Sequence, residues 1–390
     1  MNPQAAYEAR TEKLYESDGL LTKFDAVILD CIPDGDRFLI ELDQTAFFPE
    51  GGGQAADTGV IGGARISHAF IKDGRIYHDS DKPFAVGESV SCEIDLIPRR
   101  KRMQNHGAEH IISGLIHSLY GINNAGFHMS EGEITVDTAA PLSDEMVAEV
   151  ERRANQAVWE DRAIECFYPS PEELIALPYR SKTEIDGDLR IVRINGIDTC
   201  ACCAPHFRST SPIGLIKIKG FIKYKRGSRL TVAAGEDAFE NYLTVYDQAR
   251  EVARLYSAVP EEILSAVKQR EDFILEKLAE IRALKERILR LRLESILPTR
   301  DNICVFEENC DATLLKKLAN EGVALTDGLF CAFSENSDGT YSYVIVTKEG
   351  ELSSLAASIR ESLGGRGGGR GTMISGFVTA SREKIENFFS

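Results

Sequence analysis

The sequence contains no apolar run that approaches the ~18–20 residues needed by a membrane-spanning helix. Its first residues, Met1 to Gln4, are not a basic region followed by an apolar stretch, so we expect no secretory signal peptide. Cysteine occurs nine times, an odd number, and three of the nine fall within Cys200–Cys203, which is not a disulfide framework. Secretion and membrane insertion are therefore not expected, and the sequence predicts a cytoplasmic protein with reduced thiols.

Positive charge is scarce overall and unevenly distributed. The 45 Lys and Arg residues face 61 Asp and Glu residues, a formal net charge of −16, which speaks against indiscriminate nucleic-acid binding. Between Lys217 and Arg229, however, there is no acidic residue, and the lysines have odd numbers while Ile216, Ile218 and Tyr224 have even ones. A regular strand would place these lysines on one face. We predict a phosphate-contacting stripe, in preference to an ordinary solvated strand face, made of Lys217, Lys219, Lys223, Lys225 and Arg226.

A length of 390 residues indicates more than one domain. Short alternating strands separated by turns fill the first ninety residues and predict a small β-barrel. Helical and strand patterns then mix, and a long amphipathic helix ended by Pro298 follows; it packs on its own neighbouring helix or forms a dimer. We predict an α+β multidomain fold. Its domains are a β-barrel (1–95), a zinc-binding α+β domain (96–237), a helical or coiled-coil arm (238–298) and a small α/β domain with a glycine-rich loop (299–390).

Two pairs of residues have the spacing of metal ligands. His106 and His110 are four apart in a predicted helix, so both imidazoles project from one face about one turn apart. Cys202 and His206 are also four apart, but Pro205 makes a regular helix improbable there. Three imidazoles and a thiolate suit zinc better than magnesium or calcium. The unrelated alternative is a pair of structural histidines beside a buried thiol.

Other residues near these pairs are weaker candidates. His117 lies on nearly the same helix face as His110, but its ~10 Å distance from His110 along the axis makes it a packing or surface histidine. Cys200 and Cys203 offer a competing pair of thiols, which we rank second to Cys202 and His206. Arg99–Arg102 form a second basic cluster just before the predicted metal helix, with the same expected role as the lysines.

Five segments, in order along nearly the whole chain, carry a resemblance to a known family. Asp43–Gly59, His106–His110, Cys202–His206 and Thr210–Gly214 resemble the barrel and editing motifs of alanyl-tRNA synthetase, and Gly364–Arg370 is similar to its C-terminal glycine-rich loop. No segment corresponds to the aminoacylation domain. The resemblance is to the freestanding alanyl-tRNA editing proteins of the long type, often called AlaX. Where the synthetase usually has Cys-Gly-Gly-Thr-His, this chain has Cys-Cys-Ala-Pro-His, so a different loop is expected around the last ligand.

This resemblance implies an ATP-independent enzyme of translation fidelity. Its expected substrate is tRNA(Ala) mischarged with serine first and glycine second, and its expected reaction is zinc-dependent hydrolysis of the aminoacyl ester. Whether zinc activates water or anchors the substrate stays open. A non-catalytic tRNA-binding module with a structural zinc is the alternative, and a metallohydrolase for unrelated small esters is a third reading. A homodimer through the arm and the C-terminal domain is a further possibility.

The resemblance also assigns roles to individual residues. It implies a hydroxyl from Thr45 that pairs with the hydroxyl of a wrongly attached serine and disfavours alanine. Gln54 would lie close to the substrate. The expected sets are Thr45, Gln54 and Cys202 as catalytic residues, His106, His110, Cys202 and His206 as zinc ligands, and Arg366 and Arg370 beside the lysine stripe as tRNA contacts.

Overall fold

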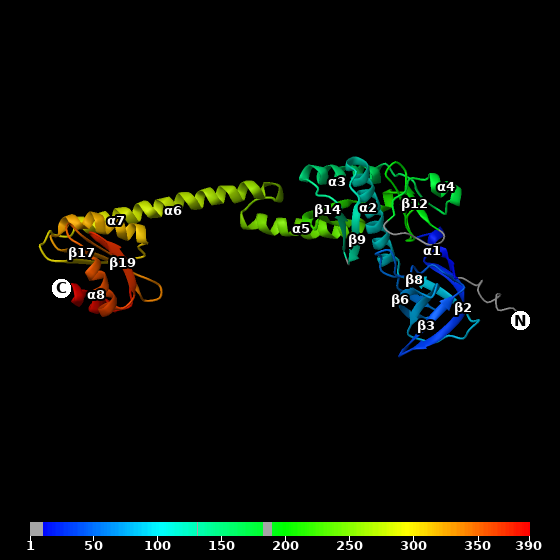
Figure 1. The fold of residues 1–390 in the computed structure, drawn as a ribbon, viewed down its shortest axis with the longest axis horizontal. Helices are drawn as coiled ribbons and strands as arrows, with labels where there is room; N and C mark the ends of the chain where they lie inside the picture. The colour runs from blue at the N-terminus through cyan, green and yellow to red at the C-terminus, as the bar shows by residue number, and fades with distance from the viewer. Residues whose placement is uncertain (1–10, 131, 182–188) are drawn as a thin grey trace. The chain divides into compact units, whose positions relative to one another are not determined.

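Two compact units, Met1–Glu251 and Val252–Ser390, make up the chain in this computed structural model. The structure describes residues 11–130, 132–181 and 189–390, so the expectation about Met1 to Gln4 lies outside the described residues. Helices and strands occur in both units (Figure 1), which confirms the predicted α+β multidomain architecture. The finer division into four domains stays a prediction, because the barrel and the candidate metal-binding region fall within one compact unit.

The first unit begins with six strands that close into a barrel in the order β2-β3-β7-β6-β5-β8. Apolar side chains such as Ile40, Leu42 and Phe47 fill its interior and are fully buried. Beside the barrel, β1 pairs in parallel with β4. The elements of this region are β1 (Glu12–Lys13), α1 (Leu14–Ser17), β2 (Lys23–Asp34), β3 (Arg37–Leu42), β4 (Gln44–Thr45), β5 (Gly59–Ile61), β6 (Ala64–Lys72), β7 (Arg75–Ser80) and β8 (Ser89–Ile94).

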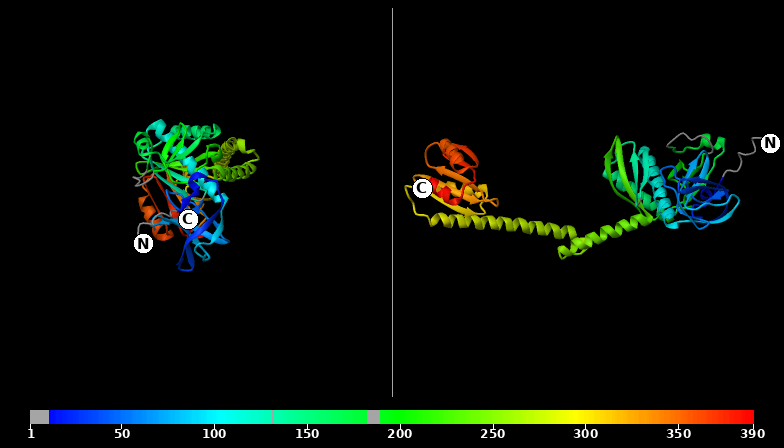
Figure 2. Two further views of the ribbon diagram at one scale, coloured as in Figure 1. Left: turned by 90° about the vertical axis from the view of Figure 1, so that its right-hand side faces the viewer. Right: turned by 90° about the horizontal axis from the view of Figure 1, so that it is seen from below.

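Helix α2 (Leu96–Tyr120) leads out of the barrel and runs past β9 toward α3 (Figure 1; two further views in Figure 2). It ends at Gly121, whose φ of 67° gives the left-handed conformation that commonly closes a helix. Its middle turns are completely buried. Two glycines permit this close packing: a Cβ on Gly107 or Gly114 would come within 2.7 Å of a neighbouring atom. At Gly114 the neighbour is Asp198, which is thereby brought against the helix.

Two sheets complete the first unit. Four strands lie in the order β14-β15-β10-β9, and three in the order β11-β12-β13. Helices α2 and α3 pack on them around a single apolar core. The elements are β9 (Asn124–Ser130), β10 (Glu133–Thr138), α3 (Asp144–Trp159), β11 (Ile164–Phe167), α4 (Pro171–Ala176), β12 (Ile191–Ile194), β13 (Asp198–Ala201), η2 (Ser211–Ile213), β14 (Ile216–Tyr224), β15 (Gly227–Ala234) and α5 (Gly235–Leu255).

The second unit consists of a long helix and a small α/β body. The predicted long helix is present as α6, and the apolar residues of its stripe from Ile274 to Leu291 are exposed. A five-stranded sheet has the order β16-β17-β18-β20-β19, with β19 at one edge. Among the described residues, none of the helices combines the length and apolarity that crossing a membrane requires. The elements are η3 (Pro260–Glu262), α6 (Ile263–Glu294), β16 (Ile303–Glu308), α7 (Ala312–Gly322), η4 (Val323–Leu325), β17 (Leu329–Glu335), β18 (Tyr341–Thr347), α8 (Ser353–Leu363), β19 (Arg366–Arg370), β20 (Met373–Val378) and α9 (Arg382–Phe389).

Candidate metal centre

The four side chains that the sequence singles out as metal ligands meet at one point. His106, His110, Cys202 and His206 each offer one ligand atom, and these atoms all lie within 4.8 Å of one another. The sulfur of Cys202 is 3.6 Å from Nε2 of His106 and 3.3 Å from Nε2 of His206. The three histidines are buried and Cys202 is partly buried. Two distant segments of chain thus supply a compact set of three nitrogens and one sulfur.

Each segment holds its ligands in a different way. Helix α2 presents His106 and His110 one turn apart, with their rings stacked at 5.2 Å between centroids and 13° between planes. Cys202 follows β13 in an irregular loop, as Pro205 predicts. The guanidinium of Arg190 stabilises this loop by donating to the carbonyl oxygens of Cys202 at 3.1 Å and of Ala204 at 2.8 Å.

Outer hydrogen bonds orient the two imidazoles on α2. Nδ1 of His110 lies 3.1 Å from a carboxylate oxygen of Asp198, which can only accept, so His110 donates from Nδ1. Nδ1 of His106 lies 2.8 Å from Oε1 of Gln54 and donates in the same way. In the neutral form of each ring, it is then Nε2 that carries the lone pair available to a metal. Nε2 of His110 is buried without a hydrogen-bond partner in the described part of the chain, and such an orphaned nitrogen fits a metal ligand.

The ionisation of the cluster also fits a metal. Burial lowers the pKa of His206 to about 4, so this imidazole is neutral at pH 7. Burial opposes ionisation of Cys202, but the adjacent His106 and His206 bring the pKa of its thiol well below the usual value. Burial lowers the pKa of His110, but the hydrogen bond that His110 donates to Asp198, together with the nearby thiols of Cys200 and Cys202, raises that pKa well above normal, so a metal competes there with a proton. Neutral imidazoles and a thiolate are the donor set that zinc prefers.

A cavity of about 350 Å³ opens onto the cluster within the first unit. Sequence reasoning missed one residue in its lining, the buried Glu109, which lies between the two histidines of α2. Its Oε1 accepts hydrogen bonds from Ser113 at 2.8 Å and Asn124 at 2.5 Å. The signal was available, because His106–His110 reads H-x-x-E-H, a spacing in which metallohydrolases combine two ligands with a carboxylate.

Gln54 and Thr45, the two predicted pocket residues of the barrel segment, contact different histidines. Gln54 reaches the cluster through His106, and the loop before it passes so close to Phe127 that a Cβ on Gly53 would lie 3.0 Å from that ring. Thr45 is fully buried elsewhere: its hydroxyl lies 2.8 Å from Nε2 of His78 and does not line the cavity. The expected contact between Thr45 and a substrate hydroxyl stays a prediction, and in this structure that hydroxyl is bonded to His78 inside the barrel.

The prediction that the lysines share one strand face is wrong. The register of β14 against β15 shifts between Ile218 and Gly220, a β-bulge that reverses the alternation of side chains. After the bulge, Lys223 is on the face of Ile218, opposite to that of Lys217. Ile222, which an unbroken alternation would place on the buried face with Ile218, is 63% exposed. A sequence pattern of period two assumes an unbroken strand, and one extra residue is enough to defeat it.

The absence of acidic residues along this segment does not persist in space. Lys217 pairs with Glu151 of α3 at 2.8 Å, and Lys219 pairs with Glu133 of β10 at 2.6 Å. Within the described residues, no carboxylate pairs with the other three basic residues of the predicted stripe. These three lie near or in the tight turn that joins β14 to β15, which we call the basic hairpin tip, and they are Lys223, Lys225 and Arg226.

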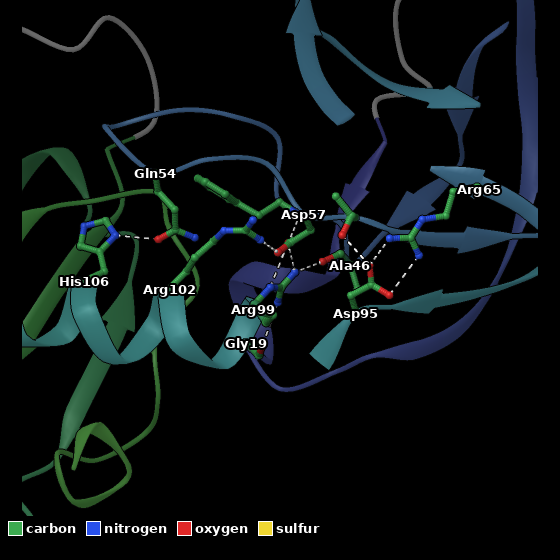
Figure 3. Close-up of polar contacts among 11 residues, drawn as sticks. Gly19, Ala46, Gln54, Asp57, Arg65, Asp95, Arg99, Arg102 and His106 are labelled. Carbon is green, nitrogen blue, oxygen red and sulfur yellow. Dashed lines mark hydrogen bonds and ion pairs between the residues drawn. The ribbon is translucent and has the colours of Figure 1, made fainter. Parts of the chain in front are cut away.

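The second basic cluster is mainly structural. Arg99 is fully buried and forms an ion pair with Asp57, while its guanidinium also donates to the carbonyl of Gly19 at 2.7 Å and to that of Ala46 (Figure 3). Its expected contact with phosphate is therefore wrong. The neighbouring charges are paired as well, Arg100 with Glu236, Lys101 with Asp237 and Glu240, and Arg102 with Asp57.

The last predicted tRNA contacts lie in the second unit. Arg366 and Arg370 begin and end β19, the edge strand of the five-stranded sheet, and both are exposed. The three residues between them are glycines, and a Cβ on the central one, Gly368, would meet open space. A flat ligand can therefore approach the backbone of this edge closely. Their role as tRNA contacts stays a prediction.

Comparison with known proteins finds relatives over part or nearly all of the chain. Residues 189–231, which include Cys202 and His206, match the family described as "Threonyl and Alanyl tRNA synthetase second additional domain". The chain is thus similar to a domain of two aminoacyl-tRNA synthetases. More particularly, it is 26% identical to the alanyl-tRNA editing protein AlaX-L of Pyrococcus horikoshii, over 96% of each chain. This finding confirms the resemblance seen in the sequence motifs.

Alanine–tRNA ligases are similar over part of their length. The ligase of Halobacterium salinarum is 34% identical over 65% of this chain, and that of Thermofilum pendens is 28% identical over 99% of it. The chain spans only 29% and 44% of these two ligases. Among solved structures, the C-Ala domain from Aquifex aeolicus alanyl-tRNA synthetase covers 24% of this chain, with 92% of that domain matched, a TM-score of 0.21 and 18% identity.

Proposed function

We propose that this protein is a cytoplasmic, zinc-dependent hydrolase that deacylates mischarged tRNA(Ala), with serine as the main misattached amino acid and glycine as the second. One observation carries the proposal: three imidazoles and a thiolate converge beside a cavity. The similarity to AlaX-L over nearly the whole chain supports the substrate class. The preference for serine is taken from the resemblance of the sequence motifs, since the hydroxyl of Thr45 is bonded to His78 in this structure.

The reaction is hydrolysis of an ester. The oxygen of water bonds to the carbonyl carbon, the bond to the ribose oxygen breaks, and a proton passes to that oxygen. Zinc, when bound, supplies Lewis-acid chemistry that polarises a carbonyl or acidifies water. His106, His110, Cys202 and His206 would hold it. Glu109 adds a carboxylate to the cavity wall that can accept a hydrogen bond from water or from the ammonium group of an aminoacyl ester.

The direct test is incubation with tRNA(Ala) esters. We expect Ser-tRNA(Ala) to be hydrolysed fastest, Gly-tRNA(Ala) more slowly, and Ala-tRNA(Ala) to be spared. Prior treatment with a chelator should remove the activity, and added zinc should restore it, since the ligands remain in place. Release of labelled amino acid over time provides the measurement.

Each alternative function gives a different outcome in the same experiment. A tRNA-binding module with a structural zinc would bind tRNA in a salt-sensitive way without releasing amino acid. Hydrolysis of small esters combined with indifference to tRNA would point to an unrelated metallohydrolase. Either result would contradict the proposed function.

Binding of tRNA is assigned to the basic hairpin tip. Changing Lys223, Lys225 and Arg226 together to glutamine should weaken tRNA binding and reduce the slope of log affinity against log salt by about 2–3, because each lost phosphate contact removes roughly 0.7–0.9. The matched control is the double change of Lys217 and Lys219 to glutamine, whose charges are already paired with Glu151 and Glu133. Filter binding at several salt concentrations measures both. An equal loss in the two variants would contradict this assignment.

The second unit supplies the remaining proposed contacts. Arg366 and Arg370 on the edge strand β19 would touch tRNA backbone, which positions a substrate without reading its bases. The exposed apolar stripe of α6 supports the proposal of a homodimer through the helical arm and the C-terminal domain.

A further inference from the structure

A second group of potential ligands shares one histidine with the candidate metal centre. His110, Asp198 and Cys200 are all buried, and their ligand atoms also lie within 4.8 Å of one another. His110 therefore stands between two sets of donors. Its Nδ1 is 3.1 Å from Asp198, which leaves Nε2, buried without a hydrogen-bond partner in the described part of the chain, as the nitrogen for the set with Cys202. A divalent ion could be held on either side of this imidazole but not by both nitrogens in one compact site.

The guanidinium of Arg180 binds the carboxylate of Asp198, the acidic member of the second group. Its Nε donates to Oδ1 of Asp198 and its Nη2 to Oδ2, both at 2.7 Å, so the pair is bidentate. The side chain of Asp198 is 2% exposed and that of Arg180 is 15% exposed. The backbone of Arg180 is fixed too, because its N–H donates to Thr199 and its carbonyl accepts from Ala201, the two residues that flank Cys200. The guanidinium is thus held rigidly against Asp198.

The chemistry of this pairing decides what Asp198 can do. A carboxylate whose two oxygens are bound by a guanidinium has its charge compensated, so it accepts a hydrogen bond from His110 Nδ1 but is a poor ligand for a cation. Without Arg180, a buried carboxylate would lie uncompensated beside a thiol and an imidazole. Such a group lowers its free energy by taking up a proton or a cation.

We propose that Arg180 is a positioning residue that decides which side of His110 holds the metal. By binding both oxygens of Asp198 it fixes the carboxylate as the hydrogen-bond partner of His110 Nδ1, and it prevents His110, Asp198 and Cys200 from binding the ion. This inference rests on the proposed metal centre and extends it to a residue that does not touch the metal.

The sharpest test uses cobalt(II) in place of zinc, because a cobalt–thiolate bond has its own charge-transfer absorption. In a Cys202→Ser background the four-ligand site has no sulfur, so we expect no such band while Arg180 is present. Adding Arg180→Gln should produce a band from Cys200, and adding Cys200→Ser as well should remove it. The matched control is Arg229→Gln, which removes an arginine with the same bidentate geometry toward Asp137 at 2.6 and 2.7 Å, and it should give no band.

Zinc affinity gives a second readout with Cys202 intact. Arg180→Gln should weaken zinc binding by about 10–100-fold, as expected for loss of a partner that orients a ligand, whereas Arg229→Gln should leave it unchanged. Arg180→Lys keeps the positive charge but cannot donate two parallel hydrogen bonds to Asp198, so its zinc affinity should be intermediate. Unchanged zinc affinity and no cobalt band in the Arg180→Gln variants would overturn the inference alone. Failure of the unaltered protein to bind either metal would instead overturn the proposed metal centre on which it depends.

Discussion

Cys202→Ala should abolish the hydrolysis of Ser-tRNA(Ala) while leaving the fold largely intact. Cys202 supplies the only sulfur among the four clustered ligand atoms, so its loss leaves three imidazoles and no thiolate charge to hold the ion. We expect the rate to fall by more than the ~10–100-fold that loss of an outer hydrogen-bond partner costs. The double change His106→Ala with His110→Ala should have the same effect.

The comparison needs zinc content, rate and circular dichroism on the same preparations. A suitable control is Cys166→Ala, since this partly buried thiol lies in β11 of the same unit and outside the ligand cluster. It should retain zinc and activity. Full activity of Cys202→Ala after metal removal would disprove the catalytic assignment, whereas loss of its circular dichroism spectrum would show that Cys202 is needed for folding instead.

Arg99→Met should destabilise the first unit by about 3–5 kcal/mol, the cost of removing one partner of a buried ion pair. Both side chains of the Arg99–Asp57 pair have no exposed area. The change would leave the buried carboxylate of Asp57 with Arg102 at 3.4 Å as its remaining ion-pair partner, and the carbonyls of Gly19 and Ala46 without the donor they share in Figure 3. Urea denaturation followed by fluorescence or circular dichroism provides the measurement.

The control for this prediction is drawn in the same figure. Arg65 and Asp95 form an ion pair whose side chains are 53% and 33% exposed, and exposed pairs contribute at most about 1 kcal/mol. Arg65→Met should therefore lower the free energy of unfolding by no more than that. Equal losses for Arg65→Met and Arg99→Met would mean that burial of the Arg99 pair has no special energetic consequence.

Local periodicity made the central part of the site predictable. The spacing of His106 and His110 fixes two rings on one helix face whatever surrounds the helix, and α2 shows that arrangement. Cys202 and His206 could be added because their residue types suit the same metal. The relative position of His106 and His110 is set by one turn of helix, so the sequence alone was sufficient there.

Contacts between distant segments were not predictable in this way. The bond between Thr45 and His78, the burial of Arg99 and the pairing of Arg180 with Asp198 each depend on how separate elements pack. The bulge after Ile218 is a further case. It leaves no clear mark in the amino-acid sequence, yet it exchanges the two faces of the strand beyond it. Charge counted along the chain likewise ignored acidic residues supplied by neighbouring elements.

The hydrogen bond from His106 to Gln54 has a consequence for how the protein can be divided. Gln54 belongs to a loop of the barrel, while the imidazole it orients belongs to α2. The boundary expected after residue 95 therefore separates a ligand from the group that sets its tautomer. A shortened protein that starts at α2 would keep all four candidate ligands but lose the hydrogen bond that orients His106. We therefore expect the barrel to contribute to metal affinity as well as to the fold.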